Sequence, residues 1–171
     1  MTEALRRDFD ALVPGERFTS PARTITEADV VGFATLTGDH HPVHTDAVWA
    51  AESAFGGRIA HGMLVLSYAL GLVPLDPERV VALRRIRDAV FKHPVRLGDT
   101  IRAEGMIERL RPVDESTGLV TTGWTIVNQR GATVARATLE VLWRRTRLPH
   151  PRPAEAGLIA DDGACPLVPP L

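Results

Sequence analysis

One short stretch of the chain, residues 37–46, carries two carboxylates and three imidazoles between two apolar segments; it reads TGDHHPVHTD. An aspartate and a histidine that lie close together can divide proton transfer between them near neutral pH. Asp39 and His44 are five residues apart, and Pro42 bends the chain between them. In a loop, that spacing can bring both side chains to one pocket, so this stretch is where we expect general acid–base chemistry.

A metal site is the rival interpretation of the same stretch. Its possible ligands are Asp39, His40, His41, His44 and Asp46. Pro42 lies between His40 and His44, however, so the stretch has no helical His-x-x-x-His platform, and zinc also needs fixed tetrahedral geometry with supporting contacts. We therefore favour acid–base chemistry and expect neither a metal nor another cofactor.

A helix is expected just before this stretch. Thr26 followed by Asp29 resembles a capping arrangement, in which a hydroxyl opens a helix and an acid lies three residues later. The apolar positions that follow suit one face of a helix, and Gly38 ends it.

The residues after Gly38 are expected to form a loop over 39–45, because Pro42 restrains His41 to an extended backbone. Asp46 is a good N-cap for a second short helix over residues 47–54. A turn over residues 55–58 follows. His40 is expected to face solvent or to have a structural role.

Residues 59–73 are nearly all apolar, which predicts a fully buried helix that is too short to cross a membrane. Gly62 lies near its N-terminal end. There a backbone N–H has no partner and lies at the positive end of the helix dipole. Because glycine has no side chain, a carbonyl oxygen can approach closely, as in an oxyanion hole.

Strands dominate the second half. We expect them over residues 80–93, 99–112, 119–128 and 133–144, after a first strand over residues 17–25. The last two are joined by a hairpin turn over residues 128–131. Antiparallel hairpins around one apolar helix predict an α+β fold with a sheet wrapped around that helix.

The bulk composition is that of one ordinary domain. The chain has 171 residues, 44% of them hydrophobic and 24% charged, with a net charge of −1, which argues against a nucleic-acid binder. We expect a lead-in over residues 1–14, one domain over residues 15–145 and a flexible proline-rich tail over residues 146–171. Without a signal-peptide pattern or a membrane span, and with Cys165 as its single cysteine, a cytoplasmic location is expected.

Three sequence pieces together resemble the MaoC-like (R)-specific enoyl-CoA hydratase/dehydratase family. The family pattern runs roughly Gly-Asp-x-Asn-Pro-x-His, a short helix, a phenylalanine, and then His-Gly-Met at the start of a long helix. Here these pieces are GDHHPVH at residues 38–44, Phe55, and HGM at residues 61–63. A further match, PVRLGDT at residues 94–100, falls where that family turns between strands. The resemblance covers about residues 15–144.

The resemblance implies a hot dog fold, a dimer whose sheets join edge to edge, and a lyase of acyl-CoA or fatty-acid metabolism. That activity is the reversible addition of water to a trans-2-enoyl thioester of CoA or a carrier protein, which gives the (R)-3-hydroxyacyl thioester. Asp39 would be the main base toward C3, and His44 would share the proton and help return one to C2. The Gly62 N–H would bind the thioester oxygen, with His41 and His61 in support. The partners implied are the substrate and a second copy, or a higher or hetero-oligomer.

Two features leave alternatives open. His41 stands where the family usually has asparagine, which could alter the pH behaviour or mark a non-catalytic hot dog subunit that binds a thioester or a partner. A hot dog thioesterase is disfavoured because residues 63–73 contain no carboxylate.

A basic run on one expected strand could contact CoA phosphates or an acidic carrier protein, or form a solvated strand face. Its members are Arg84, Arg85, Arg87 and Lys92.

Overall fold

The computed structural model of the chain describes residues 3–145. The expected tail over residues 146–171 lies outside the described residues. The lead-in contains two short 3-10 helices, η1 (Glu3–Arg6) and η2 (Phe9–Ala11).

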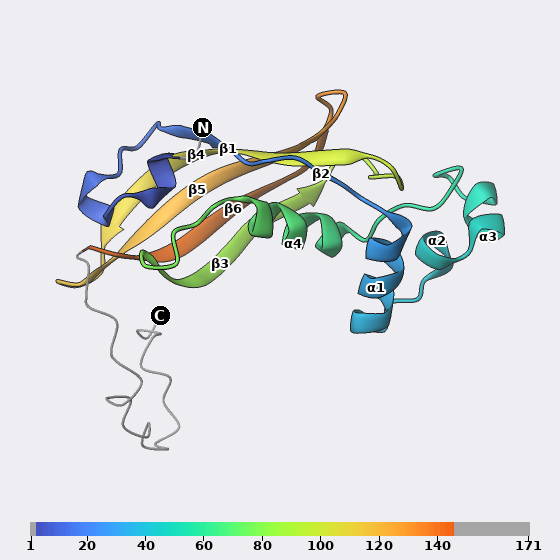
Figure 1. Cartoon of the computed structure of the whole chain (residues 1–171), viewed down its shortest axis with the longest axis horizontal. Coiled ribbons are helices and arrows are strands. Elements are labelled where there is room, and N and C mark those ends of the chain that lie inside the picture. Colours follow the sequence, from blue (N-terminus) through green and yellow to red (C-terminus); the bar gives the residue numbers. More distant parts are fainter. Residues whose placement is uncertain (1–2, 146–171) are drawn as a thin grey trace, which may run out of the picture.

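One antiparallel sheet forms the body of the molecule (Figure 1). Its strands are β1 (Arg17–Thr19), β2 (Arg23–Thr24), β3 (Val80–Phe91), β4 (Thr100–Pro112), β5 (Thr117–Asn128) and β6 (Thr133–Arg144). The strand order is β1-β4-β5-β6-β3, and β2 also pairs with β4. The four long strands that the alternation predicted are therefore confirmed, with ends that differ by one or two residues.

The helices lie in two places. The long helix α4 (Gly62–Leu72) crosses one face of the sheet, whereas α1 (Glu27–Thr37), α2 (Pro42–Thr45) and α3 (Ala47–Glu52) form a lobe beyond one end of it (Figure 1). The expected α+β arrangement, a sheet around a helix, is confirmed.

The core fills the space between α4 and the sheet. Leu64, Val65 and Ala69 of α4 are buried, as are Ile126 and Leu139 on the central strands. Their chain neighbours, such as Thr125 beside Ile126 and Thr138 beside Leu139, point to the other face, as the pleat requires.

One glycine admits an aromatic ring to this core. Gly105 of β4 lies directly opposite Phe18 of β1, and the buried Phe18 ring covers it. A Cβ at position 105 would lie 2.1 Å from that ring. The ring also meets Trp124 edge-on, with centroids 5.9 Å apart.

The first expected strand, residues 17–25, is broken in two. Between β1 and β2, the Ser20 N–H still donates to the Ala103 carbonyl at 2.8 Å, but the Ala103 N–H donates to the Ser20 side chain, to Oγ at 2.9 Å, instead of to the backbone. Pro21 follows and has no N–H to donate, which ends the pairing.

The long helix begins at Gly62 rather than at residue 59. Ile59 forms a bridge with Arg96, and the Ala60 N–H donates to the Val95 carbonyl at 2.8 Å. These bonds keep residues 59 and 60 extended. The expectation of a fully buried helix is also wrong, because an outer stripe of α4 is exposed. The stripe consists of Met63, Ser67 and Gly71.

Gly105→Ala tests the packing of the Phe18 ring. The new methyl group would overpack the core, and we expect a loss of about 1–3 kcal/mol in the free energy of unfolding. The same substitution at Gly32, in an open position of α1, should instead stabilise by about 0.5–1 kcal/mol because alanine favours helix. Urea unfolding of both variants checks this, and an equally stable G105A protein would contradict it.

Candidate active site

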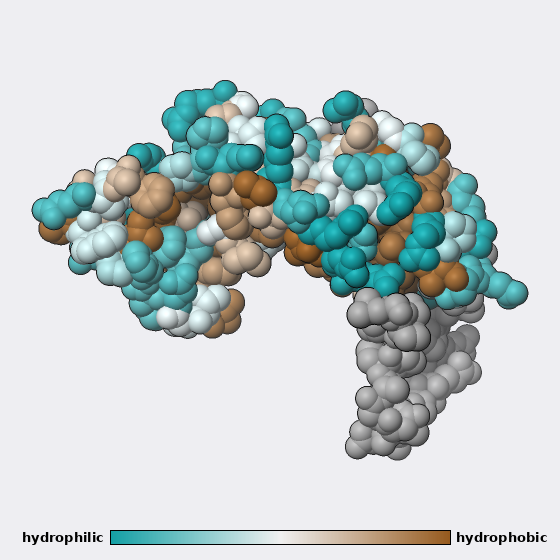
Figure 2. All heavy atoms as spheres, turned by 180° about the vertical axis from the view of Figure 1, so that it is seen from behind, coloured by the Kyte–Doolittle hydropathy of each residue, from teal (hydrophilic) through white to brown (hydrophobic). Residues whose placement is uncertain are grey.

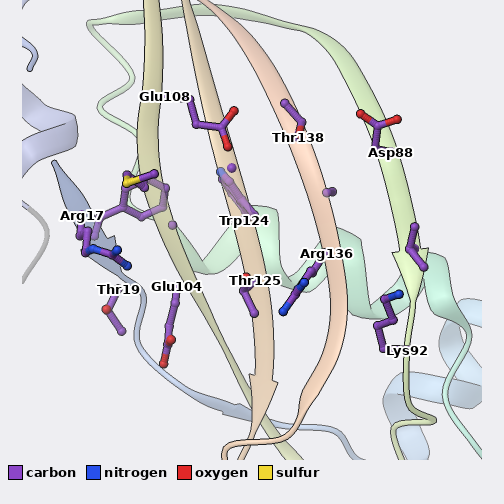
Figure 3. Close-up of a pocket in the computed structure, with 16 residues that line it drawn as sticks. Arg17, Thr19, Asp88, Lys92, Glu104, Glu108, Trp124, Thr125, Arg136 and Thr138 are labelled. Atoms are coloured by element: carbon purple, nitrogen blue, oxygen red, sulfur yellow. The ribbon is translucent and has the colours of Figure 1, made fainter. Parts of the chain in front are cut away.

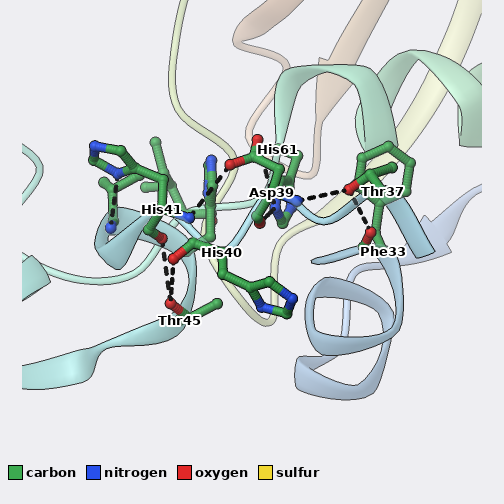
Figure 4. A network of polar contacts seen from close by, with 10 residues as sticks. Phe33, Thr37, Asp39, His40, His41, Thr45 and His61 are labelled. Carbon is green, nitrogen blue, oxygen red and sulfur yellow. Dashed lines mark hydrogen bonds and ion pairs between the residues drawn. The ribbon is translucent and has the colours of Figure 1, made fainter. Parts of the chain in front are cut away.

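The C-terminal end of α1 directs the chain toward the candidate active site. Thr26 and Asp29 form the expected capping box at its start, and Gly38 ends it in the left-handed region with φ 77°. Beyond Gly38, the Thr37 hydroxyl accepts the Asp39 N–H at 3.3 Å (Figure 4). Asp39 therefore enters the site from a fixed helix end.

A half-buried contact anchors α1 to α4. The Tyr68 hydroxyl on α4 donates to Asp29 Oδ1 at 2.6 Å, and the Arg23 guanidinium donates to the same oxygen at 2.9 Å. Burial opposes ionisation of Asp29, but the hydrogen bonds from Tyr68, Thr26 and Arg23 outweigh it and hold its pKa well below the usual range. Tyr68 thus joins two helices.

Side-chain caps shape the stretch after Asp39. Asp39 Oδ1 accepts the His41 N–H at 3.3 Å, and His41 Nδ1 in turn accepts the Val43 N–H at 3.1 Å (Figure 4). Pro42 does keep His41 extended, as expected. Residues 42–45 are nevertheless the one-turn helix α2 rather than a loop, because His41 caps it and proline suits the first helical position. Asp46 caps α3 as expected.

His44 is held with one ring nitrogen free for chemistry. Its Nδ1 lies 2.8 Å from the Ile59 carbonyl oxygen, which accepts, so Nδ1 carries the proton and Nε2 has the lone pair. Burial lowers the pKa of His44 below the ordinary 6.5. The Ile59 bond and Asp39 oppose this shift, and His61 and His41 add to it.

His61 supports the site from beneath. Its buried ring stacks on that of His44, with centroids 3.7 Å apart and an interplanar angle of 26°. Its Nε2 meets the Asp39 carbonyl oxygen at 3.0 Å, and its Nδ1 has no hydrogen-bond partner among the described residues. His61 occupies the N-cap position of α4, but its side chain makes no capping bond to the helix and contacts Asp39 instead.

The three side chains of Asp39, His44 and His61 converge. One nitrogen or oxygen atom from each lies within 4.8 Å of the others, and Asp39 Oδ2 is 4.0 Å from His61 Nε2. Such a set could suggest a metal site. The two rings, however, are stacked face to face, and each has one nitrogen engaged with a backbone carbonyl oxygen. Acid–base work suits this arrangement better than tetrahedral coordination.

A cavity of about 280 Å³ opens beside His44 and Gly62. Its walls are largely apolar and include Val65, Phe91 and Val134; Asp39 is not among its lining residues. The Phe91 ring lies over Gly62 so closely that a Cβ there would be 2.8 Å from it. As the first residue of α4, Gly62 has an N–H without an acceptor in the helix.

A larger hollow of about 610 Å³ lies on the other face of the sheet, opposite α4 (Figure 3). Arg17, Arg136 and Glu104 are among the charged side chains around it, so both signs of charge alternate over an open surface. The smaller cavity is lined by His44, the member of the converging set that reaches it, and by Gly62, and we place the chemistry there.

The basic run divides between the two faces of β3. Arg85 and Arg87 form ion pairs with the buried Glu140 carboxylate, at 3.8 and 3.0 Å. Lys92, one residue beyond the end of β3, lines both the cavity beside His44 and the larger hollow, and Arg84 is half-buried on β3. Of the four phosphate candidates, Lys92 is therefore the one that the structure brings to the site.

Arg58 is a positioning residue that the sequence pattern did not reveal. Its Nε donates to the His44 carbonyl oxygen at 2.7 Å, and its Nη1 pairs with Glu27 of α1 at 2.6 Å. Arg58 thereby fixes the end of α2 that carries His44. The Ile59 carbonyl and the Phe91 ring were missed as well, because only the folded chain brings them to the loop.

The chain is similar to known proteins of one family. The family model described as MaoC like domain matches residues 9–128. Protein MaoC of Klebsiella aerogenes is 44% identical over 98 residues, which are 57% of this chain and 29% of that protein. The (R)-specific enoyl-CoA hydratase of Rhodospirillum rubrum is 36% identical over 107 residues, 61% of this chain and 72% of that protein. The chain thus spans less than a third of the MaoC protein.

Solved structures show the same fold. An Archaeoglobus protein described as a monoamine oxidase regulatory protein is 40% identical, with a TM-score of 0.77 over 83% of this chain and 99% of that one. A Mycobacterium tuberculosis protein described as a double hotdog fold, 23% identical, matches 96% of this chain and 53% of its own with a TM-score of 0.74. The fold is therefore a hot dog fold.

No helix within residues 3–145 is both long enough and apolar enough to span a membrane. The match to the family model extends over most of the described domain and includes every residue of the loop, α2 and the start of α4. The chain belongs to the MaoC-like domain family, whose relatives include hydratases and dehydratases.

Proposed function

We propose that the protein is a hydro-lyase that reversibly adds water to a trans-2-enoyl thioester and forms the (R)-3-hydroxyacyl thioester. The observation that carries the proposal is the free Nε2 of His44 close to the Asp39 carboxylate, beside the first N–H of α4. The hydratase and dehydratase names of its relatives point the same way.

In the proposed reaction, Asp39 and His44 hold one water molecule between them. As the water oxygen bonds to C3, its proton passes to Asp39, with His44 Nε2 sharing it. The electron pair of the C2=C3 bond moves toward the thioester and forms an enolate. The proton then returns to C2 through His44, which completes the addition and restores both side chains.

The Gly62 N–H stabilises the enolate in this mechanism. Charge develops on the thioester oxygen, and a preorganised donor at a helix start binds that charge without rearranging. Removing one such donor typically costs about 2.7–4 kcal/mol of transition-state stabilisation. The apolar walls around Phe91 and Val134 suit an acyl chain, and Lys92 suits a phosphate of CoA or an acidic carrier protein.

No metal or redox cofactor enters the proposal, since the two proton transfers and the charge stabilisation are all assigned to protein groups. A non-catalytic subunit was the alternative that His41 raised. The His41 ring supplies the acceptor that an asparagine oxygen would offer at this position, and His44 is correctly held, which favours an active enzyme.

Asp39→Asn and His44→Ala test the mechanism. Each should lower kcat/KM for hydration of crotonyl-CoA by about 10²–10⁴, the usual contribution of a general acid or base. Loss of the enoyl absorbance measures the rate, and circular dichroism checks the fold. His40→Ala, at an exposed neighbour, is the matched control and should retain activity. Full activity in either site variant would refute the mechanism.

The pH dependence follows from the lowered pKa of His44. His44 acts as a base only when neutral, so activity should persist as the pH falls below 6.5 and then decline with an apparent midpoint under that value. The free energy of unfolding should change in the same direction. Because the pKa of His44 is lower in the folded state, His44 is protonated first in the unfolded chain as the pH falls below 6.5, and the folded state loses stability as the pH drops toward the folded pKa. A kcat/KM profile with its midpoint above 6.5 would contradict this assignment.

We also propose that the chain forms a homodimer through β3 and the outer stripe of α4. β3 is an edge strand and exposes Leu83, Ile86 and Val90, while Met63 is exposed on the apolar helix α4. Apolar surface is visible on both the sheet body and the helical lobe (Figure 2). An edge strand with exposed apolar side chains readily pairs with another chain, and an apolar helix is normally covered.

Light scattering after size exclusion tests the dimer. The expected mass is twice the 18.6 kDa of one chain. Ile86→Glu should shift the mass toward the monomer, because a charge would be desolvated at the paired edge. Val13→Glu, at an exposed residue outside β3 and α4, is the matched control. A monomeric wild-type protein at micromolar concentration would overturn the assembly but not the hydratase proposal.

A further inference from the structure

We propose that His41 is a protonation-sensitive cap that positions His44. In its neutral form the His41 ring holds the start of α2 and thereby places the His44 imidazole; when protonated, it releases that end of the helix. The inference deepens the proposed function and rests on it where activity is concerned.

The cap is defined by one hydrogen bond. His41 Nδ1 accepts the Val43 N–H at 3.1 Å, and His41 has an extended backbone with φ −54° and ψ 135°, as an N-cap residue requires. The helix that it caps has only four residues and cannot be stable by itself. The local bonds at its ends therefore decide whether it forms.

The cap controls His44 because α2 is so short. His44 is the third residue of α2, and its N–H donates to the His41 carbonyl oxygen at 2.9 Å. Thr45 Oγ1 donates to the same oxygen at 3.3 Å. Arg58 holds the other end of the turn through the His44 carbonyl. Release of the His41 side would leave His44 held by Arg58 and by the bond from its Nδ1 to Ile59, and its backbone could then shift relative to Asp39.

Protonation reverses the role of His41 Nδ1. Neutral imidazole with its hydrogen on Nε2 presents a lone pair at Nδ1, which accepts the Val43 N–H. Imidazolium has N–H groups at both nitrogens, so two donors would then face each other. Histidine ordinarily changes charge between pH 5 and 8, whereas an asparagine oxygen accepts throughout that range.

Two titratable side chains lie near His41. The residue is exposed, and the charged group nearest to its backbone is the Asp39 carboxylate, which accepts the His41 N–H. The His44 ring on α2 is the other titratable neighbour, with centroids 6.3 Å apart. From α3, the uncharged Trp49 ring meets His41 edge-on at 5.5 Å, and Asp46 is engaged in capping α3.

His41→Asn separates this effect from the titration of His44. The substitution keeps an acceptor but removes the charge change, and His44 is common to both proteins. We expect the ratio of wild-type to H41N kcat for crotonyl-CoA to be close to one above pH 7.5 and to fall by roughly three- to thirtyfold toward pH 5, the effect of losing a typical N-cap. His41→Ala, with no acceptor, should show that loss at every pH. A flat ratio from pH 5 to 8 would overturn the proposal.

Nuclear magnetic resonance tests the cap without any substrate. In the ¹⁵N-labelled wild-type protein, the Val43 amide signal and the His44 ring signals should shift as His41 is titrated. In H41N, the part of each shift that follows the titration of His41 should be absent. His40→Asn, at the neighbouring exposed histidine, is the matched control and should leave them unchanged.

The activity assay and the NMR titration test the two proposals independently. If no variant hydrates any thioester, the hydratase proposal fails, while the Val43 and His44 signals still decide whether His41 is the cap. If Val43 and His44 ignore the titration of His41, or respond equally in H41N, the cap proposal fails whatever the activity.

Discussion

Burial of α4 against the sheet is the constraint on which the site depends. Leu64, Val65 and Ala69 pack onto the inner face, and each large apolar side chain buried this way contributes about 1.5–3 kcal/mol. With the helix body fixed, its first N–H group, that of Gly62, has one position in the molecule. The polar loop must assemble at that point, and the buried His61 ring, stacked under His44, joins the two.

The loop itself is held by side chains that complete backbone hydrogen bonds. Thr37, Asp39, His41 and Asp46 each accept a backbone N–H just beyond them, and the segment changes direction at each of these bonds. Buried or half-buried N–H groups need such partners. A polar sequence that resembles a catalytic cluster is thus also a structural one, and the same residues serve both purposes.

The sequence predicted what local chemistry decides. The Thr26 capping box, the Gly38 stop and the Asp46 cap depend on neighbouring residues, and strand alternation depends on the pleat. The Ile59 carbonyl, Arg58 and Phe91 could not be predicted, because strand register and tertiary packing bring them to His44. The helical turn of α2 was missed because histidine is an uncommon N-cap, and its role appears only with the Val43 N–H in place.

The two carboxylate oxygens of Asp39 make different contacts. Oδ1 is committed to the His41 N–H, while Oδ2 faces His61 Nε2 at 4.0 Å. The carboxylate therefore cannot rotate to exchange its oxygens without breaking the turn that His41 begins. A planar enoyl group in the cavity would meet a base on one of its faces only. In the proposed hydration, facial selectivity, and with it the handedness of the new stereocentre, would then depend on the backbone hydrogen bond that orients the carboxylate.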